Sequence, residues 1–345
     1  MVKFDFIPLD EKTELWFETQ QKQHLYLSYS WLKTQQLTYG FEILLVVDTK
    51  GQYQTAFCKL NDMMGKRLIS LPFSDYLPFG EMNSAHVEQL FNVSANRFPG
   101  YTIVLKTDID KQVLEKGFNL QKEAVYHTIS LTAVNKLKQS SSFTRGVKQA
   151  KKNGLHTRIN TSMIGLVEFY RIYHRLRFDK FGIIPQPFSF FENLFEEFRK
   201  EGNIVIFEAL LGEKVIASMI ILKQGKTAYY KYGCSDLEHL TLKPNNILFH
   251  DLIKHFKEQN LENIDLGLSG AGENYAGLRR WKSSMGGIEK PITYWSLDSK
   301  QNEASNELIE INKKKIRGLT DAIVRSDLGP QETSALSEQI YPLLA

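Results

Sequence analysis

The chain has 345 residues, of which 42% are hydrophobic and 24% are charged. This composition excludes a disordered or collagen-like chain, and the length predicts about two domains with full cores. The formal net charge is only +4, so the total does not by itself indicate a nucleic-acid-binding protein. Cys58 and Cys234 stand far apart with no second cysteine or histidine at metal-ligand spacing, so we expect neither a disulfide framework nor a metal site.

Two segments bear on where the protein acts. Acidic residues interrupt the N-terminal segment, which argues against a signal peptide. The most apolar stretch, residues 204–222, is broken by charged residues around Gly212 and therefore predicts two strands and a turn instead of a membrane span. We expect a cytoplasmic protein without a transmembrane segment, which could still lie peripherally on the inner face of the membrane.

The first half of the chain predicts a mixed α/β unit, because β-branched and aromatic runs alternate with helical patterns. Its expected elements are a helix near 30–38, a hairpin of 42–47 and 52–60, a strand at 67–71, a helix at 84–96, and strands at 101–107 and 125–131. A serine-rich polar joint follows Asn135 and can cap a helix that begins near Phe143. We place the domain boundary at this joint.

The second half of the chain predicts a similar order of helices and strands. Its expected elements are helices at 162–181 and 188–201, a hairpin within 203–223, a strand at 226–233, a helix at 245–259, a strand at 263–267, a helix around Leu278 and a strand at 292–297. Both halves place a hairpin after helical sequence and before a strand, a helix and further strands, which is typical of a tandem duplication. A helical tail is expected from about Glu303 to Leu328.

Besides the order of its elements, the chain contains several short segments that could identify a family. They are SLPFSDYLPFG in the first half and, in the second, SSFTRGVKQAKKNGL, FYRIYHRLRFDKFGIIPQPFSFFENLF, TAYYKYGCS, KPNNILFHDLI, IDLG and GLRRWKSSMGG. With this order of elements, the chain resembles GNAT N-acyltransferases in tandem, as in the Fem family of aminoacyl transferases. The family's RKAxKxG and FKxxFG motifs correspond here to Lys148, Gln149 and Ala150 and to Trp281, Lys282, Met285 and Gly286.

The resemblance implies an α/β fold with mixed sheets, built as two tandem GNAT-like acyltransferase domains. We expect the first domain at 1–137, the second at 138–300, and a helical tail at 301–345 that can pack on the first domain. The implied enzyme is a Fem-like, peptidoglycan interpeptide bridge aminoacyl transferase. It would move an amino acid from aminoacyl-tRNA to an amine of a UDP- or lipid-linked peptidoglycan precursor, with no tightly bound cofactor.

Two other hypotheses stay open. Tandem-GNAT relatives that use acyl-CoA suggest an N-acyltransferase acting on an amino sugar or exopolysaccharide precursor. Such enzymes generally carry Q/R-x-x-G-x-G/A before the helix after the fourth strand, because backbone N–H groups there bind pyrophosphate. This chain has GCSDLEHLTLKPNN instead, whose Asp236 and Glu238 would repel phosphate, although the amides after Pro244 could still bind an anion. The third hypothesis is a non-catalytic RNA- or nucleotide-binding module with the same fold.

Basic residues are concentrated near the domain joint. Residues 136–180 contain eleven basic side chains and two acidic ones. At about 100° per residue, the bases of the helix that begins near Phe143 lie opposite its apolar residues. The basic side carries Arg145, Lys148 and Lys152, and the apolar side carries Phe143, Val147 and Ala150. The basic side predicts contact with a phosphate-rich ligand such as tRNA, and the alternative is an ordinary solvated helix face.

Two charged residues fall on the apolar sides of their predicted helices. Arg177 lies one turn beyond Tyr173, so it must find a partner, either in a salt bridge or in the carboxylate or phosphate of a substrate. Lys282 lies between Trp281 and Met285 on a helix whose apolar side also includes Leu278. This lysine predicts either a structural ion pair or a group that acts on the ester carbonyl oxygen or a tRNA phosphate. We predict that Lys282 is catalytic and that Arg177 and Trp281 bind substrate.

Further candidates are expected at the substrate site. Alternation along residues 227–233 puts Tyr230 and Tyr232 on one face of a strand. There they either pack in the core or line the substrate channel, with Tyr232 near the scissile bond. In the first half, Lys33, Asp75 and Tyr76 are candidates for binding the acceptor, although a Pro-bounded loop with Asp is commonly just a turn.

The sequence contains no nucleophile triad, and aminolysis of an activated ester needs none. A lysine-like acceptor amine has a pKa of ~10.4 in solution and must lose a proton before it attacks. Asp265, Glu273 or the departing ribose hydroxyl could take that proton, and the sequence does not choose among them.

Overall fold

The computed structural model describes residues 3–20, 24–79, 82–115, 117–132, 137–297, 303–326 and 328–345. The chain forms two compact units: unit 1 comprises residues 1–124, 291–320 and 338–345, and unit 2 comprises residues 125–290 and 321–337. Each unit therefore combines segments that are distant in the sequence. The domains expected at 1–137, 138–300 and 301–345 are continuous stretches of the sequence, whereas the compact units are not. Those domain limits stay a prediction. Asn135 and Lys136 of the expected joint lie outside the described residues.

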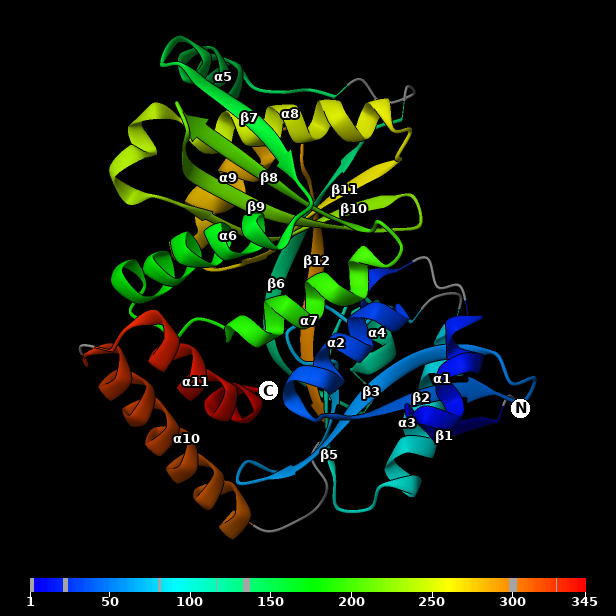
Figure 1. The fold of residues 1–345 in the computed structure, drawn as a ribbon. Coiled ribbons are helices and arrows are strands. Elements are labelled where there is room, and N and C mark those ends of the chain that lie inside the picture. Colours follow the sequence, from blue (N-terminus) through cyan, green and yellow to red (C-terminus); the bar gives the residue numbers. More distant parts are fainter. Residues whose placement is uncertain are drawn as a thin grey trace. The chain divides into compact units, whose positions relative to one another are not determined.

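Unit 1 contains strands in the order β1-β2-β3-β4-β5-β12 (Figure 1). They are β1 (Phe4–Pro8), β2 (Glu42–Asp48), β3 (Tyr53–Asp62), β4 (Gly65–Ser70), β5 (Thr102–Thr107) and, from Pro291 on, β12 (Ile288–Leu297). Neighbouring strands are antiparallel except β4 and β5, which are parallel. The helices among residues 3–115 are α1 (Glu11–Glu18), η1 (Leu25–Leu27), α2 (Tyr29–Tyr39), α3 (Ser84–Arg97) and α4 (Lys111–Leu114).

Unit 2 contains strands in the order β7-β8-β9-β10-β11-β6. They are β7 (Leu155–Asn160), β8 (Ile204–Leu211), β9 (Lys214–Gln224), β10 (Thr227–Ser235), β11 (Asn263–Gly270) and, from Val125 on, β6 (Asn119–Ser130). Strands β7 to β10 are antiparallel in succession, and β10 is parallel to β11. The helices among residues 137–290 are α5 (Ser141–Lys152), α6 (Met163–Arg175), η2 (Leu176–Lys180), α7 (Phe188–Arg199), η3 (Leu237–Leu242), α8 (Pro244–Glu258), η4 (Glu273–Tyr275) and α9 (Ala276–Ser284).

The two units repeat one topology, which confirms the expected tandem GNAT-like fold. In each, four antiparallel strands are followed by a helix and by a strand parallel to the fourth. The sixth strand differs in origin, because β12 from the second half of the sequence completes unit 1 and β6 from the first half completes unit 2. Both strands were predicted but their exchange was not, since a strand's own residues do not identify its partner.

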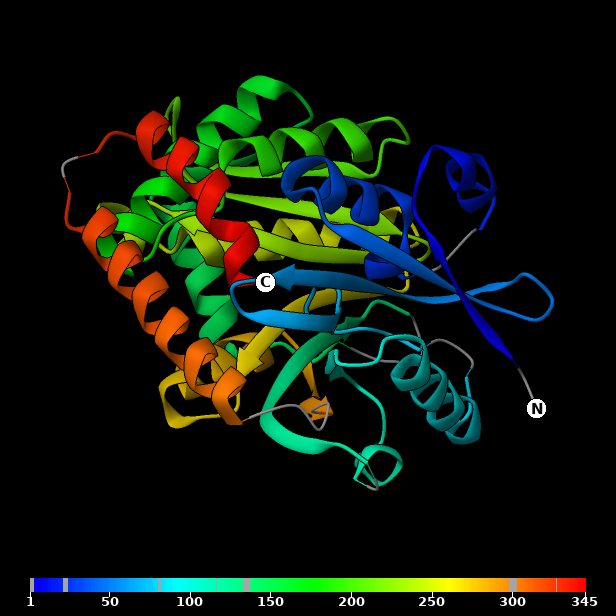
Figure 2. The same cartoon turned by 90° about the horizontal axis from the view of Figure 1, so that it is seen from below.

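The ends of the chain contain elements that the sequence analysis missed. Strand β1 and helix α1 were not predicted. The tail is helical, as expected, and consists of α10 (Glu303–Val324) and α11 (Pro330–Ile340), followed by η5 (Tyr341–Leu344); α10 and α11 can be followed in orange and red in Figure 2. Pro330 is the first residue of α11, a position where proline is favoured because the first N–H groups of a helix have no partner within it. No helix of the described residues is long and apolar enough to cross a bilayer.

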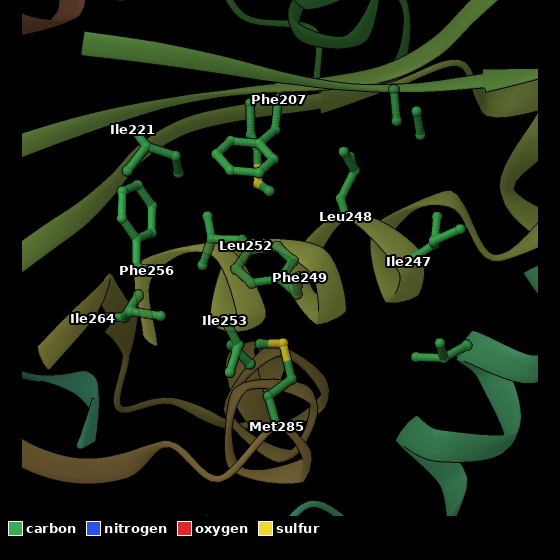
Figure 3. Close-up of a cluster of buried hydrophobic side chains, with 14 of the residues drawn as sticks. Phe207, Ile221, Ile247, Leu248, Phe249, Leu252, Ile253, Phe256, Ile264 and Met285 are labelled. Atoms are coloured by element: carbon green, nitrogen blue, oxygen red, sulfur yellow. The ribbon is translucent and has the colours of Figure 1, made fainter. Parts of the chain in front are cut away.

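Helix α8 packs on one face of the unit 2 sheet, and α6 lies on the other (Figure 1). Phe207 of β8 and Ile221 of β9 point toward Leu252 and Phe256 of α8 in the core shown in Figure 3. Helix α5 approaches α8 closely, because a Cβ at Gly146 would lie 2.4 Å from the side-chain nitrogen of Asn246. The glycine therefore permits the contact that holds the basic helix beside α8.

Glu208 of β8 is a fully buried carboxylate whose main partner comes from β7. The Nε and Nη2 atoms of Arg158 both lie 2.7 Å from Glu208 Oε2, and Asn160 Nδ2 lies 3.2 Å from Oε1. Removal of the arginine would leave a buried charge without its main compensation.

Arg158→Ala is therefore expected to lower the free energy of unfolding by about 1–3 kcal/mol, because half of the arginine side chain is exposed and water can replace part of the pair. Urea unfolding at neutral pH measures the change. Arg175→Ala is the matched control, since Arg175 is exposed and lies 4.0 Å from Asp179; we expect less than about 0.5 kcal/mol. Equal losses in the two variants would show that the Glu208 pair contributes nothing specific.

Candidate functional site

Strands β10 and β11 part within the unit 2 sheet. Their parallel register covers three positions, the last of which pairs Tyr229 with Asp265. Both strands continue beyond that pair, β10 to Ser235 and β11 to Gly270. Beyond Tyr229 and Asp265 the register does not pair the two strands with each other, and an extended substrate could bind along the diverging edges. Asp265 is 4% exposed and lies where the strands part.

A β-bulge lies in β10 beside this point. The register with β9 passes from Tyr230 directly to Tyr232 and skips Lys231. Tyr230 packs on Phe249 of α8, with 4.8 Å between ring centroids, whereas Tyr232 packs on Phe191 of α7 at 5.0 Å. The expectation that both tyrosines share a face is therefore wrong, because the bulge reverses the alternation of side chains.

Arg177 and Tyr232 are connected through Tyr173. Arg177 lies in η2, a π-helical turn that extends α6, and its Cζ is 5.8 Å from the centroid of the Tyr173 ring. The rings of Tyr173 and Tyr232 meet edge to face at 6.4 Å. Burial raises the pKa of Tyr173 although the Arg177 charge opposes this, so the phenol is neutral near pH 7. Arg177 and Tyr232, both predicted to bind substrate, therefore lie on either side of Tyr173, which was predicted only to pack in the core.

Lys282 is buried, as predicted, at 3% exposure. Its Nζ donates hydrogen bonds of 2.8 Å to the backbone oxygens of Gly267 and Leu268. Gly267 has a φ of 74°, a left-handed conformation that suits glycine, and its N–H donates to Asp265 Oδ1 at 2.7 Å. The ammonium group therefore attaches α9 to the irregular end of β11, close to Asp265 in the sequence.

The surroundings of Lys282 differ in part from expectation. Leu278, expected on the apolar side of α9, is 40% exposed. Trp281 is half-buried and packs on Phe249, with 4.9 Å between ring centroids.

His127 of β6 is a buried residue near Lys282 that no local sequence pattern indicates. It is fully buried, and its Nε2 lies 3.2 Å from Glu289 Oε1. Burial and then the charge of Lys282 lower the pKa of His127, so its imidazole is neutral near pH 7.

Helix α5 divides its faces as predicted. Phe143, Val147 and Ala150 are buried, and Arg145, Lys148, Lys151 and Lys152 are exposed. Ser140 caps the helix, because its Oγ accepts the N–H of Phe143 at 3.1 Å. Within the described part of the chain, none of these four bases forms an ion pair. We call Arg145, Lys148, Lys151 and Lys152 the α5 basic face, a surface whose positive charge is not neutralised by neighbouring acids.

The start of α8 offers few amides to a phosphate. Pro244 has no N–H, and the N–H groups of Lys243 and Asn246 donate to the backbone oxygens of Leu240 and Lys243, each at 3.1 Å. Lys243 has a φ of 66° and provides no side-chain cap. This helix start therefore lacks the row of available donors that a pyrophosphate site needs.

The loop before α8 carries acidic groups. Asp236, Glu238 and His239 could bring metal-ligand atoms within 4.8 Å of one another, the one such group found among the described residues. Lys214 Nζ lies 3.3 Å from Asp236, and this positive charge opposes a cation there. Burial alone would raise the pKa of Asp236, but the Glu238 N–H and Lys214 outweigh it and lower the pKa. The loop also lines a cavity of about 150 Å³ together with Arg171 and Arg175.

The candidates of the first half lie in unit 1. The Tyr76 hydroxyl is 2.8 Å from His24 Nε2, and His24 Nδ1 accepts the N–H of Tyr26 at 3.3 Å. Burial lowers the pKa of His24 to about 4, although the charge of Asp75 opposes this. The neutral imidazole then carries its proton on Nε2 and donates to the Tyr76 hydroxyl. Lys33 lies 3.3 Å from Glu14.

Residues 138–283 match the family model described as an acetyltransferase (GNAT) domain. This match and the repeated topology of the two units give the chain a tandem GNAT fold with an acyltransferase domain in its second half. Sequence comparison with curated proteins finds no match.

Solved structures share this fold at low sequence identity. FemX is 15% identical with a TM-score of 0.66, over 89% of this chain and 100% of its own. The C-terminal domain of a putative lysylphosphatidylglycerol synthetase from Agrobacterium fabrum is 12% identical with a TM-score of 0.60, over 89% and 98%. The structure of L-PGS from Bacillus licheniformis is 12% identical with a TM-score of 0.58, over 88% and 97%.

Proposed function

We propose that the protein is a Fem-like aminoacyl transferase that moves an amino acid from aminoacyl-tRNA to an amine of a peptidoglycan precursor. The observation that carries the proposal is the α5 basic face, whose four bases form no ion pair with the described residues and lie beside an α8 start with few available amides. Such a surface suits the many phosphates of tRNA better than the single pyrophosphate of CoA. The fold shared with FemX supports the same conclusion.

The proposed reaction is aminolysis of the tRNA ester. The acceptor nitrogen attacks the ester carbonyl, a C–N bond forms, and the bond between the carbonyl carbon and the ribose oxygen breaks. The amine proton passes to the departing ribose oxygen, either directly or through Asp265. Lys282, attached to the end of β11 near Asp265, would stabilise negative charge on the carbonyl oxygen. The group of Arg177, Tyr173 and Tyr232 would hold an anionic part of the acceptor.

Transfer from competing donors tests this proposal. The purified chain is given labelled aminoacyl-tRNA or labelled acetyl-CoA, each with a UDP-linked muropeptide or an amino sugar as acceptor. We expect an amide-linked amino acid on the muropeptide from tRNA and no product from acetyl-CoA.

The description of the matched domain as an acetyltransferase favours the second candidate, an acyl-CoA N-acyltransferase. Acetyl transfer to the amino sugar, without transfer from tRNA, would establish that candidate instead.

Arg177→Lys is expected to raise the KM for the acceptor about tenfold with a smaller change in kcat. The substitution keeps the charge but loses the planar group that stacks on Tyr173 and can bind a carboxylate or phosphate with two hydrogen bonds. Steady-state transfer kinetics with varied acceptor measure the effect. Arg171→Lys is the matched control, because Arg171 is exposed and pairs with Glu168 on the same helix. A lower melting temperature with an unchanged KM would identify Arg177 as structural.

A further inference from the structure

We propose that Arg279 is a positioning residue that, together with Lys282, fixes the backbone at the end of β11 and thereby the carboxylate of Asp265. Arg279 and Lys282 are three residues apart on α9, so their side chains leave the helix on the same side. Arg279 Nη1 donates to the backbone oxygen of Gly270 at 2.5 Å and to that of Gly272 at 2.9 Å. Arg279 therefore binds both the last residue of β11 and the loop that follows it.

The backbone of β11 is irregular where the two bases of α9 bind. In a regular strand, the C=O groups of successive residues point to opposite edges. Lys282 nevertheless binds the oxygens of two successive residues, Gly267 and Leu268, and the left-handed φ of Gly267 accounts for this arrangement. Because the register with β10 ends at Asp265, hydrogen bonds to β10 do not hold this segment. The bases of α9 hold it instead, through four carbonyl groups.

The same segment orients Asp265, which can carry the amine proton to the ribose oxygen in the proposed reaction. Asp265 Oδ1 accepts the N–H of Gly267 at 2.7 Å, so a shift of the Gly267 backbone would move the carboxylate. A proton carrier must lie within hydrogen-bond reach of the amine, and small displacements are costly. Arg279 can thus affect the rate without contact to the substrate, and in this respect the inference rests on the proposed function.

Glu289 of β12 contributes a further contact to Arg279. Its Oε1 lies 3.8 Å from Arg279 Nε and 3.2 Å from Nε2 of the buried His127. The Arg279 side chain is only 19% exposed, so a nearby carboxylate offsets part of the cost of removing the guanidinium from water. We therefore expect Glu289→Gln to act in the same direction as loss of Arg279, with a smaller effect.

Transfer kinetics of two variants test the inference. Arg279→Met removes the donors but keeps an unbranched side chain, and we expect kcat to fall by about 10- to 100-fold. The KM values should change by less than about twofold, because the residues proposed to bind the substrates are retained. Arg279→Lys should recover most of the lost rate, since Lys282 shows that one ammonium can donate to two carbonyl oxygens. The donor is whichever of aminoacyl-tRNA and acetyl-CoA supports transfer by the parent chain.

Hydrogen exchange provides a readout that needs no transfer. Mass spectrometry follows the amides of residues 263–272, which include the Gly267 N–H that Asp265 accepts. Arg279→Met should make this segment exchange at least about tenfold faster. Arg280→Met is the matched control, because Arg280 is the next residue of α9 and is exposed. The control should keep the kcat and the exchange rates of the parent chain.

The two readouts separate the possible outcomes. A lower melting temperature with the parent kcat would make Arg279 merely structural and overturn the inference, as would unchanged exchange or equal losses in Arg280→Met. If the parent chain transfers from neither donor, the proposed function fails, while faster exchange in Arg279→Met alone still supports its hold on β11. If Arg279→Met does not fold, Glu289→Gln provides the same two readouts.

Discussion

Lys282→Met is expected to lower both the stability of the protein and the rate of transfer. Methionine keeps most of the side-chain length but removes the ammonium that donates to the backbone oxygens of Gly267 and Leu268. Two buried acceptors would lose their donor, which should lower the free energy of unfolding by about 2–4 kcal/mol. If the same charge stabilises the developing oxyanion, kcat should fall by about 10² to 10³. Urea unfolding and single-turnover transfer on one preparation measure both effects.

Two further variants make the Lys282 result interpretable. Lys254→Met on α8 is the control, because Lys254 is exposed and should tolerate the change with less than about 0.5 kcal/mol lost. Lys282→Arg keeps a positive charge and so provides a readout if Lys282→Met does not fold. A folded Lys282→Met protein that is destabilised but transfers at the parent rate would limit Lys282 to holding α9 on β11. Parent stability together with parent transfer would contradict both roles.

Reversing the charge of Arg145, Lys148 and Lys152 to glutamate is expected to weaken tRNA binding by at least about 10²-fold at low salt. Each basic side chain that neutralises a phosphate releases a counterion, so the slope of log affinity against log salt should become shallower by about 2 to 3. Stability should change little, because these side chains are exposed and form no ion pair within the described part of the chain. Fluorescence anisotropy with labelled tRNA across a salt series measures the slope.

The matched control reverses Lys226, Lys254 and Lys257, three exposed bases of unit 2 that lie outside the α5 basic face. This variant changes the net charge by the same amount, so it reports the general effect of charge on tRNA binding. An unchanged salt slope in the α5 variant, or an equal change in the control, would show that the α5 basic face is an ordinary solvated helix surface. Loss of tRNA binding with normal acetyl transfer would favour the acyl-CoA enzyme.

Part of the candidate site follows from local sequence patterns. The division of α5 into a buried and a basic side, and the burial of Lys282, follow from positions along a helix. The prediction that Tyr230 and Tyr232 share one face of their strand was wrong, because one extra residue in β10 reverses the direction of every side chain after it. Nothing in the TAYYKYG segment distinguishes a regular strand from one with a bulge.

The sequence by itself determined most of the helices and strands from β2 to β12, the repeated plan and the concentration of basic residues, because each depends on neighbours along the chain. Only the tertiary structure decided that β12 completes unit 1, that β6 completes unit 2 and that Lys282 binds the backbone of β11. These arrangements join residues far apart in sequence. Backbone N–H and C=O groups are the same in every residue, so their pairing depends on the packing of the whole unit and leaves no local pattern.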